Sequence, residues 1–339
     1  MESKAGTPNK NKKTLIALGA FAIGLVAVLA YNPLDYEYQA GPLPETFDAY
    51  LAERLTASEA AGVRPDNEER LVRYAPKTEY AILFIHGFGA SRAEGELVID
   101  QIGEEFQANT YYMRLPGHGT DKERHAAVKY TDYIDATEAA FAMMSKLGEK
   151  IIISGSSTGA LLAAYLAAQH PDEVHAIILG SPLFEFKDPT SAIFTLPGGM
   201  LIVNGAFGEI RDANWGEDPE KRKQPGYEDY WLTTQYYSAL QPLAELRKYI
   251  VQDHILGRIT TPSLLLYYYK DEERQDQVVD VQGNLEHFAS FGKLQGGAHP
   301  ESRAVAVADG NHILMSEYVR TDKELILNSI RDFLRALEK

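Results

Sequence analysis

The segment Gly155-Ser156-Ser157-Thr158-Gly159 has the residue types and spacing of a serine nucleophile on a sharp turn. It follows an apolar run expected to form a buried strand (150–154) and precedes an Ala- and Leu-rich stretch expected to form a helix (158–170). Glycines suit this place because a tight strand-to-helix turn needs small neighbours and lifts the serine hydroxyl above the sheet. The pattern predicts Ser157 as a nucleophile, and a Gly/Ser loop without chemistry is the alternative.

A second segment, His86-Gly87-Phe88-Gly89-Ala90-Ser91, follows another expected strand (80–85). A tetrahedral oxyanion needs two aimed N–H donors, and a loop in this place can supply one of them. We predict an oxyanion hole made by the N–H groups of Phe88 and Thr158, whereas an ordinary glycine-rich turn is the alternative. His86 is expected to brace the loop. A third segment, Leu115-Pro116-Gly117-His118-Gly119, follows strand 110–114 and is expected to lie over the site.

The general base is sought among nine histidines. A serine nucleophile on a strand-to-helix turn of this kind is followed along the chain by an acid and then by a histidine. His312 comes directly after the last expected strand (304–308) and is therefore predicted to be the base. The remaining histidines precede Ser157, flank the end of its helix, or fall in other segments: His86, His118, His125, His170, His175, His254, His287 and His299.

The acid that orients the histidine is expected after strand 263–269. Asp276 is preferred, because the adjacent Val278 and Val279 can pin its loop, and Asp271, nearer the strand end, is the alternative. No H-E-x-x-H or calcium-loop spacing is present, and the chain contains no cysteine, so we expect neither a metal nor a cofactor.

The order of expected elements predicts an α/β fold with a mostly parallel central sheet and helices on both faces. The expected strands are 71–74, 80–85, 110–114, 150–154, 174–179, 263–269 and 304–308, and the expected helices are 45–61, 95–108, 131–147, 158–170 and 321–337. Ligands of such sheets bind beyond the carboxyl ends of the strands, where all three motifs lie. We expect one catalytic domain over residues 45–339.

Residues 182–260 break the alternation and are interpreted as an inserted lid. Its candidate substrate-binding residues are Phe194, Leu196 and Met200, which could form an acyl-chain wall or touch lipid, and Trp231, which could line a pocket. Packing of the lid against the sheet is the alternative. An acidic group, Glu217, Asp218 and Glu220, could hold a cationic amine, although a solvated acidic face is the simpler interpretation.

The N-terminus has a different composition from the rest of the chain. Four lysines precede an uncharged run whose apolar part, residues 15–31, is long enough as a helix to cross a bilayer core. Residues 1–31 are predicted to be a signal-anchor, with a cleaved signal peptide and a buried helix as alternatives, and residues 32–44 a linker. The positive-inside rule then places the catalytic domain on the periplasmic or extracellular side, either membrane-anchored or secreted after cleavage.

The formal net charge of −15 lacks the basic footprint that a nucleic-acid partner requires. With 45% hydrophobic and 24% charged residues in 339, the chain has the composition of a globular protein with a sizeable core. A small molecule is therefore the expected partner, and the oligomeric state is left open.

Over about residues 70–338 the sequence resembles the α/β-hydrolase superfamily, within it the branch of monoacylglycerol lipases and bacterial carboxylesterases. The resemblance rests on His86–Gly89, Leu115–Gly119, Gly155–Gly159, Asp276–Val279 and the Asn311-His312 pair. It implies a Ser157, Asp276 and His312 triad that hydrolyses acyl esters, such as monoacylglycerols or lysolipids, through an acyl-enzyme. The tyrosines at 267–269, Lys270 and the long lid depart from the family pattern and bear on the substrate. A peptidase of the proline-iminopeptidase kind and a catalytically inactive envelope binding protein are the alternatives.

Overall fold

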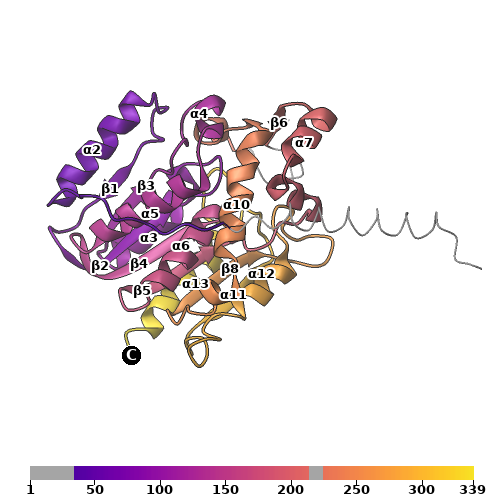
Figure 1. Cartoon of the computed structure of the whole chain (residues 1–339). Helices are drawn as coiled ribbons and strands as arrows, with labels where there is room; N and C mark the ends of the chain where they lie inside the picture. The colour runs from indigo at the N-terminus through magenta and orange to yellow at the C-terminus, as the bar shows by residue number, and fades with distance from the viewer. Residues whose placement is uncertain (1–33, 214–223) are drawn as a thin grey trace, which may run out of the picture.

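The computed structural model describes residues 34–213 and 224–339 (Figure 1). A seven-stranded sheet of order β1-β3-β2-β4-β5-β8-β9 forms its centre. Only the edge strand β1 runs antiparallel, against β3, and the other pairings in this sheet are parallel. The strands are β1 (Arg70–Val72), β2 (Thr78–Ile85), β3 (Asn109–Met113), β4 (Gly148–Ser156), β5 (Val174–Gly180), β8 (Ser263–Tyr268) and β9 (Arg303–Val307).

Each strand that the sequence predicts for this sheet is present, with ends that differ by one or two residues. The five predicted helices are also present, as α2 (Phe47–Ala60), α3 (Glu96–Glu105), α5 (Tyr130–Met144), α6 (Thr158–Gln169) and α13 (Lys323–Ala336). Two short helices, α4 (Lys122–Ala126) and α12 (Val281–Phe288), lie in connections between strands.

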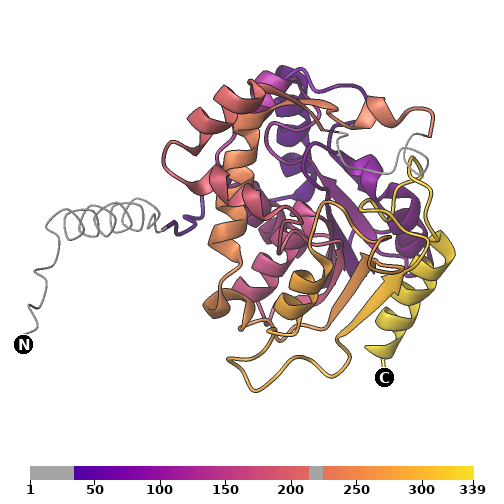
Figure 2. The same cartoon turned by 90° about the vertical axis from the view of Figure 1, so that its right-hand side faces the viewer.

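Helices cover both faces of the sheet (Figures 1 and 2). Along β2 the side chains alternate, so that Ala81, Leu83 and Ile85 join one buried cluster and Ile82 and Phe84 join the other. The first cluster packs against α2, α5 and α6, and the second against α3 and α13. This arrangement explains why the central strands are apolar throughout, because neither face meets water.

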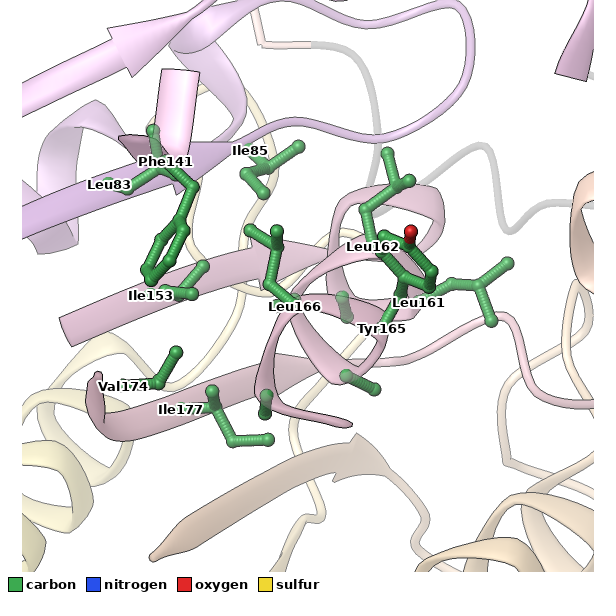
Figure 3. Packing of buried hydrophobic residues seen from close by; sticks show 14 of the residues in the cluster. Leu83, Ile85, Phe141, Ile153, Leu161, Leu162, Tyr165, Leu166, Val174 and Ile177 are labelled. Atoms are coloured by element: carbon green, nitrogen blue, oxygen red, sulfur yellow. The ribbon is translucent and has the colours of Figure 1, made fainter. Parts of the chain in front are cut away.

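Helix α6 is buried on nearly every side, and it anchors the turn that precedes it. Figure 3 shows Leu166 of this helix beside Ile85 and Ile153 of the sheet, and Leu161, Leu162 and Tyr165 belong to the same buried cluster. Every residue from Thr158 to Ala168 is buried. A helix held this firmly fixes the position of its own N-terminus, and therefore of the residue just before it.

Between β5 and β8 the chain forms the predicted insertion. It contains η2 (Pro189–Thr195), α7 (Gly199–Phe207), β6 (Ile210–Asp212), α9 (Tyr227–Tyr230), β7 (Thr234–Tyr236), η3 (Tyr237–Ala239), α10 (Leu240–Ile250) and α11 (Asp253–Leu256). Strands β6 and β7 pair antiparallel as a separate two-stranded sheet. The sequence pattern did not predict this small sheet.

The start of the described chain, expected to be a linker, has neither helix nor strand before α2. It nevertheless packs on the domain, because the Tyr249 hydroxyl donates to the Tyr36 carbonyl oxygen at 2.6 Å and the Tyr36 hydroxyl donates to Asp135. Within residues 34–213 and 224–339 no helix is both long and apolar enough to cross a bilayer. The predicted membrane segment at 1–31 lies outside the described residues.

Candidate active site

Ser157 lies between the end of β4 and the start of α6, in a strained backbone conformation. Its φ of 52° and ψ of −112° are unusual for a residue with a side chain and carry a cost of about 1–3 kcal/mol. The two glycines of the motif are required by contact. A Cβ on Gly155 would lie 2.3 Å from Gly159, and one on Gly159 would lie 1.9 Å from the carbonyl oxygen of Ile85. The turn can thus be this tight only because both positions lack a side chain.

Residues 86–91, here called the oxyanion loop, follow β2 and lie beside this turn. A Cβ placed on Gly87 would be 3.2 Å from the Cβ of Ser157. The His86 ring is fully buried, with Nδ1 donating to the Gly87 carbonyl oxygen at 2.8 Å and Nε2 accepting from the Leu115 N–H at 3.1 Å. Burial lowers the pKa of His86 to about 4, so its ring is neutral at pH 7.

The His86 contact sets the direction of the next peptide group. In a trans peptide the carbonyl and the N–H point to opposite sides, so the Phe88 N–H points away from the His86 ring. Thr158 is the first residue of α6, where backbone N–H groups have no partner within the helix. The two predicted oxyanion donors therefore belong to backbone segments that flank Ser157.

Asp276 and His312 are joined by a short hydrogen bond. His312 Nδ1 donates to Asp276 Oδ2 at 2.8 Å, and the aspartate side chain is 1% exposed. The second carboxylate oxygen, Oδ1, accepts from the N–H groups of Val278 at 2.8 Å and Val279 at 3.1 Å. Asp276 follows β8 and His312 follows β9, so both lie at the sheet edge where β4 delivers Ser157.

Asp271, the alternative acid, lies elsewhere in the same loop. Its carboxylate accepts from Arg274 Nε at 2.8 Å, and this contact lowers the pKa of Asp271. The side chain is 39% exposed. In the described structure Asp271 forms a surface ion pair, while Asp276 contacts the histidine.

Glu94 is a buried acid at the site that sequence reasoning missed. It ends the short turn η1 (Arg92–Glu94), is 2% exposed, and accepts a hydrogen bond from the Gly87 N–H of the oxyanion loop. Burial raises the pKa of Glu94, while Gly87, His312 and Ser156 act in the opposite direction. The only sequence signal is an acid eight residues after His86, and no periodicity marks it.

Two further histidines pack beneath the oxyanion loop in an aromatic cluster. The ring centroids of His118 and His125 are 4.6 Å apart, and Phe88 lies 4.4 Å from His125. Burial lowers the pKa of both histidines, to about 3 for His125. Neither ring contacts a carboxylate within residues 34–213 and 224–339, so the histidine–acid pair at this sheet edge is His312 with Asp276.

The candidate substrate-binding residues are distributed over the insertion. Phe194 is half-buried against the core, Met200 is partly exposed, and Leu196 is 43% exposed. Trp231 is buried and stacks on Tyr227 with centroids 4.3 Å apart. The acidic group at 217, 218 and 220 lies outside the described residues.

The insertion is bonded directly to the oxyanion loop. The Leu232 N–H donates to the Gly89 carbonyl oxygen at 2.7 Å, and Gln235 Nε2 donates to the Leu232 carbonyl oxygen at 2.9 Å. A Cβ on Gly89, whose φ is +72°, would lie 2.4 Å from this Gln235 nitrogen. The insertion thus bonds to the loop at Gly89, and Glu94 and the His86 ring bond to it at Gly87.

No group of three or more His, Asp or Glu side chains that could hold a metal ion occurs in the described part of the chain. At one edge of the sheet the structure places a serine on a strained turn and a histidine bonded to a buried carboxylate.

Curated proteins similar in sequence include lipases and hydrolases. The thermostable monoacylglycerol lipase of Bacillus sp. (strain H-257) is 28% identical over 102 residues, which are 29% of this chain and 39% of the lipase. The alpha/beta hydrolase domain-containing protein aho-3 of Caenorhabditis elegans is 22% identical over 298 residues, covering 76% of this chain and 89% of that protein. The match therefore spans less than half of the lipase but most of aho-3.

Solved structures share the fold. The metagenome-derived lipolytic enzymes LipS and LipT include a structure with a TM-score of 0.60 at 20% identity, covering 81% of this chain and 99% of that one. A soluble variant of monoglyceride lipase from Saccharomyces cerevisiae gives a TM-score of 0.58 at 14% identity, covering 80% of this chain and 91% of that one. A model of the alpha/beta hydrolase family matches residues 82–321, and the chain therefore belongs to that family.

Proposed function

We propose that the protein is a serine hydrolase of carboxylic esters, with Ser157 as nucleophile, His312 as base and Asp276 as the acid that orients it. The observation that carries this proposal is the buried 2.8 Å hydrogen bond from His312 to Asp276, at the sheet edge where Ser157 lies on its strained turn. Family membership and relatives named as lipases support ester hydrolysis.

In the first half of the reaction, His312 Nε2 takes the proton of the Ser157 hydroxyl as the oxygen attacks the ester carbonyl carbon. The bond from Nδ1 to Asp276 holds the proton on Nδ1, which leaves Nε2 free to act as base. Asp276 then stabilises the imidazolium, and its own charge is held by the Val278 and Val279 N–H groups.

The tetrahedral intermediate carries a negative charge on the former carbonyl oxygen. The N–H groups of Phe88 and Thr158 are proposed to receive it, and the N-terminus of α6 adds a favourable dipole. His312 gives its proton to the departing alcohol, which leaves Ser157 esterified. The same base then takes a proton from water as the water oxygen attacks the acyl carbon. The bond from that carbon to the Ser157 oxygen breaks, His312 returns the proton to this oxygen, and the carboxylic acid leaves.

The proposed substrates are acyl esters with one long chain, such as monoacylglycerols or lysolipids. Two observations support this class: the monoacylglycerol lipase among the relatives, and the apolar stretch of the insertion that contains Phe194, Leu196 and Met200. These three residues, with Trp231, are the proposed contacts of the substrate.

Labelling with a fluorophosphonate tests the nucleophile, because such probes react with activated serines. We expect labelling of the wild type, none of Ser157→Ala, and hydrolysis of p-nitrophenyl esters whose chain-length optimum reports the size of the acyl pocket. Labelling of a folded protein that cleaves aminoacyl amides and no esters would favour a peptidase. A folded wild type without any labelling would favour a binding protein.

We further propose that residues 1–31 anchor the protein in a membrane, with the hydrolase domain on the periplasmic or extracellular side. The support is the sequence alone: four lysines before an uncharged apolar run. The test is protease treatment of spheroplasts, whose inner membrane is intact, together with alkaline extraction of membranes. Protection of the domain from protease, or release of the full-length chain by alkali, would contradict this proposal.

A further inference from the structure

Glu94 lies where three parts of the proposed site meet, and it has no assigned role in the reaction described above. Its turn, η1, is held by the loop after β9, since the Ser316 hydroxyl donates to the Ala93 carbonyl oxygen at 2.8 Å. The side chain is turned inward and is 2% exposed. A carboxyl group removed from water in this way is costly to bury unless its oxygens are hydrogen-bonded.

The partners of that carboxyl group come from three segments of the proposed site. One oxygen accepts the Gly87 N–H of the oxyanion loop, the Ser156 hydroxyl also bonds to the carboxyl group, and the His312 ring is close enough to interact with its charge. A Cβ on Gly87 would lie 3.1 Å from both Glu94 oxygens and 3.2 Å from the Ser157 Cβ. Gly87 is therefore enclosed between the acid on one side and the nucleophile on the other.

This enclosure matters because glycine has the most permissive backbone of all residues. Glu94 holds the Gly87 N–H and the His86 ring holds the Gly87 carbonyl oxygen, so both peptide groups of this glycine are fixed. The second of these peptide groups carries the Phe88 N–H, the proposed oxyanion donor. Without the acid, one of the two restraints on its direction is lost.

We propose that Glu94 is a positioning residue for ester hydrolysis: its buried carboxyl group fixes Gly87 and thereby aims the Phe88 N–H at the oxyanion. This inference rests on the proposed function. An N–H donor that points in the wrong direction stabilises the transition state less, but it leaves binding of the ester in the ground state unchanged. Loss of Glu94 should therefore lower kcat and leave KM unchanged.

The test compares three variants of the full chain. Glu94→Ala removes the acceptor, Glu94→Asp withdraws the carboxyl group by one methylene, and Glu94→Gln keeps a carbonyl oxygen in reach of the Gly87 N–H. We expect kcat for a p-nitrophenyl ester to fall about 10- to 100-fold in the Ala and Asp variants, with KM within about twofold. Glu94→Gln should recover most of the wild-type kcat.

Glu138→Ala is the matched control. Glu138 is also a buried acid, paired with His170 at 2.8 Å at the far end of α6, so its loss costs stability without touching the site. Its kcat per folded molecule should equal that of the wild type. If Glu94→Ala does not fold, the Asp and Gln variants still decide the question.

Two results would overturn the role of Glu94: an unchanged kcat in the Asp variant, or a Gln variant as slow as the Asp variant. A loss that appears only in KM would overturn it as well. Fluorophosphonate labelling distinguishes a failure of the role proposed for Glu94 from a failure of the proposed function. A wild type that is not labelled at Ser157 contradicts the hydrolase itself, whereas a labelled and active wild type confines any failure to Glu94.

Discussion

His312 Nδ1 donates to Asp276 Oδ2 at 2.8 Å, and this bond joins the loop after β8 to the loop after β9. The two residues are adjacent because β8 and β9 are neighbouring parallel strands, whose carboxyl ends lie side by side. The position of the acid is fixed independently by the Val278 and Val279 N–H groups. The orientation of the imidazole is thus set by backbone, which does not change with the substrate.

The first prediction concerns which aspartate serves the histidine. Asp276→Asn should lower kcat roughly 10³- to 10⁴-fold, because an amide favours the wrong tautomer of His312 and cannot stabilise the imidazolium. Asp271→Asn should change kcat less than about twofold, since Asp271 pairs with Arg274 at the surface. Steady-state hydrolysis of one ester by both variants checks this, and the opposite ranking would refute the assignment of Asp276.

The second prediction follows from the backbone strain at Ser157. Ser157→Gly should raise the free energy of unfolding by about 1 kcal/mol, because glycine accepts a positive φ without strain. Ser157→Ala keeps the Cβ and should leave the stability close to that of the wild type. Both variants should be inactive. Urea denaturation compares them, and equal stabilities of the Gly and Ala variants would show that the turn stores no strain.

The third prediction is acid sensitivity caused by buried neutral histidines. Burial lowers the pKa of His125 to about 3, whereas an unfolded histidine titrates near 6.5. Between these values the unfolded state binds more protons, so His125 contributes stability that is complete above about pH 6.5 and is lost as the pH falls. From pH 7 to pH 5 this loss amounts to about 2 kcal/mol.

His125→Phe isolates that contribution. Neither ring nitrogen of His125 has a hydrogen-bond partner within the described residues, and the ring packs against Phe88, so phenylalanine keeps the contacts. Between pH 7 and pH 5, the free energy of unfolding of the variant should fall by about 2 kcal/mol less than that of the wild type. Unfolding free energies at the two pH values measure the difference. An identical pH dependence in both proteins would mean that His125 is not buried in its neutral form.

The fourth prediction tests the contact between the insertion and the oxyanion loop. Gly89→Ala should lower both stability and kcat, since a side chain is strained at a φ of +72° and the added Cβ, 2.4 Å from Gln235 Nε2, pushes that amide off the Leu232 carbonyl oxygen. We expect a loss of activity of at least tenfold per folded molecule, because the loop shifts relative to Ser157. Activity equal to the wild type would show that the loop tolerates this shift.

Gly205→Ala is the control for that substitution. Gly205 lies within α7, has no heavy atom within 4 Å of an added Cβ, and has no positive φ. Alanine in an exposed helix is favoured over glycine by about 1 kcal/mol, so this variant should be at least as stable as the wild type. The temperatures of thermal unfolding should therefore shift in opposite directions in the two alanine variants, and only Gly89→Ala should lose ester turnover.

The strands and helices of the central sheet could be predicted because their local signals agree with the fold. Apolar runs of strand length alternate with helical periodicity, and glycines mark the turn at Ser157, so pattern and structure coincide. The proximity of Asp276 and His312 is not visible in the sequence alone. It follows once parallel order is assumed, because consecutive strands then end at the same edge.

The insertion and Glu94 show why the rest could not be predicted. The strands β6 and β7 are three residues each, too short for any periodic pattern, and their pairing is decided by tertiary contacts. The stacking of Trp231 on Tyr227, next to Tyr318 from a distant part of the sequence, is likewise a tertiary contact that no local pattern predicts. In the sequence Glu94 has the pattern of an ordinary exposed charged residue, and only the fold shows that its carboxyl group contacts Gly87 rather than water.

The bond from the Leu232 N–H to the Gly89 carbonyl oxygen has a consequence for how the protein is made. Segments leave the ribosome in order, so the oxyanion loop and Ser157 emerge long before Leu232, Asp276 and His312. A nascent chain therefore presents a nucleophile without a base and an oxyanion loop without its outer support. The groups proposed for catalysis are therefore assembled only when the chain is almost complete.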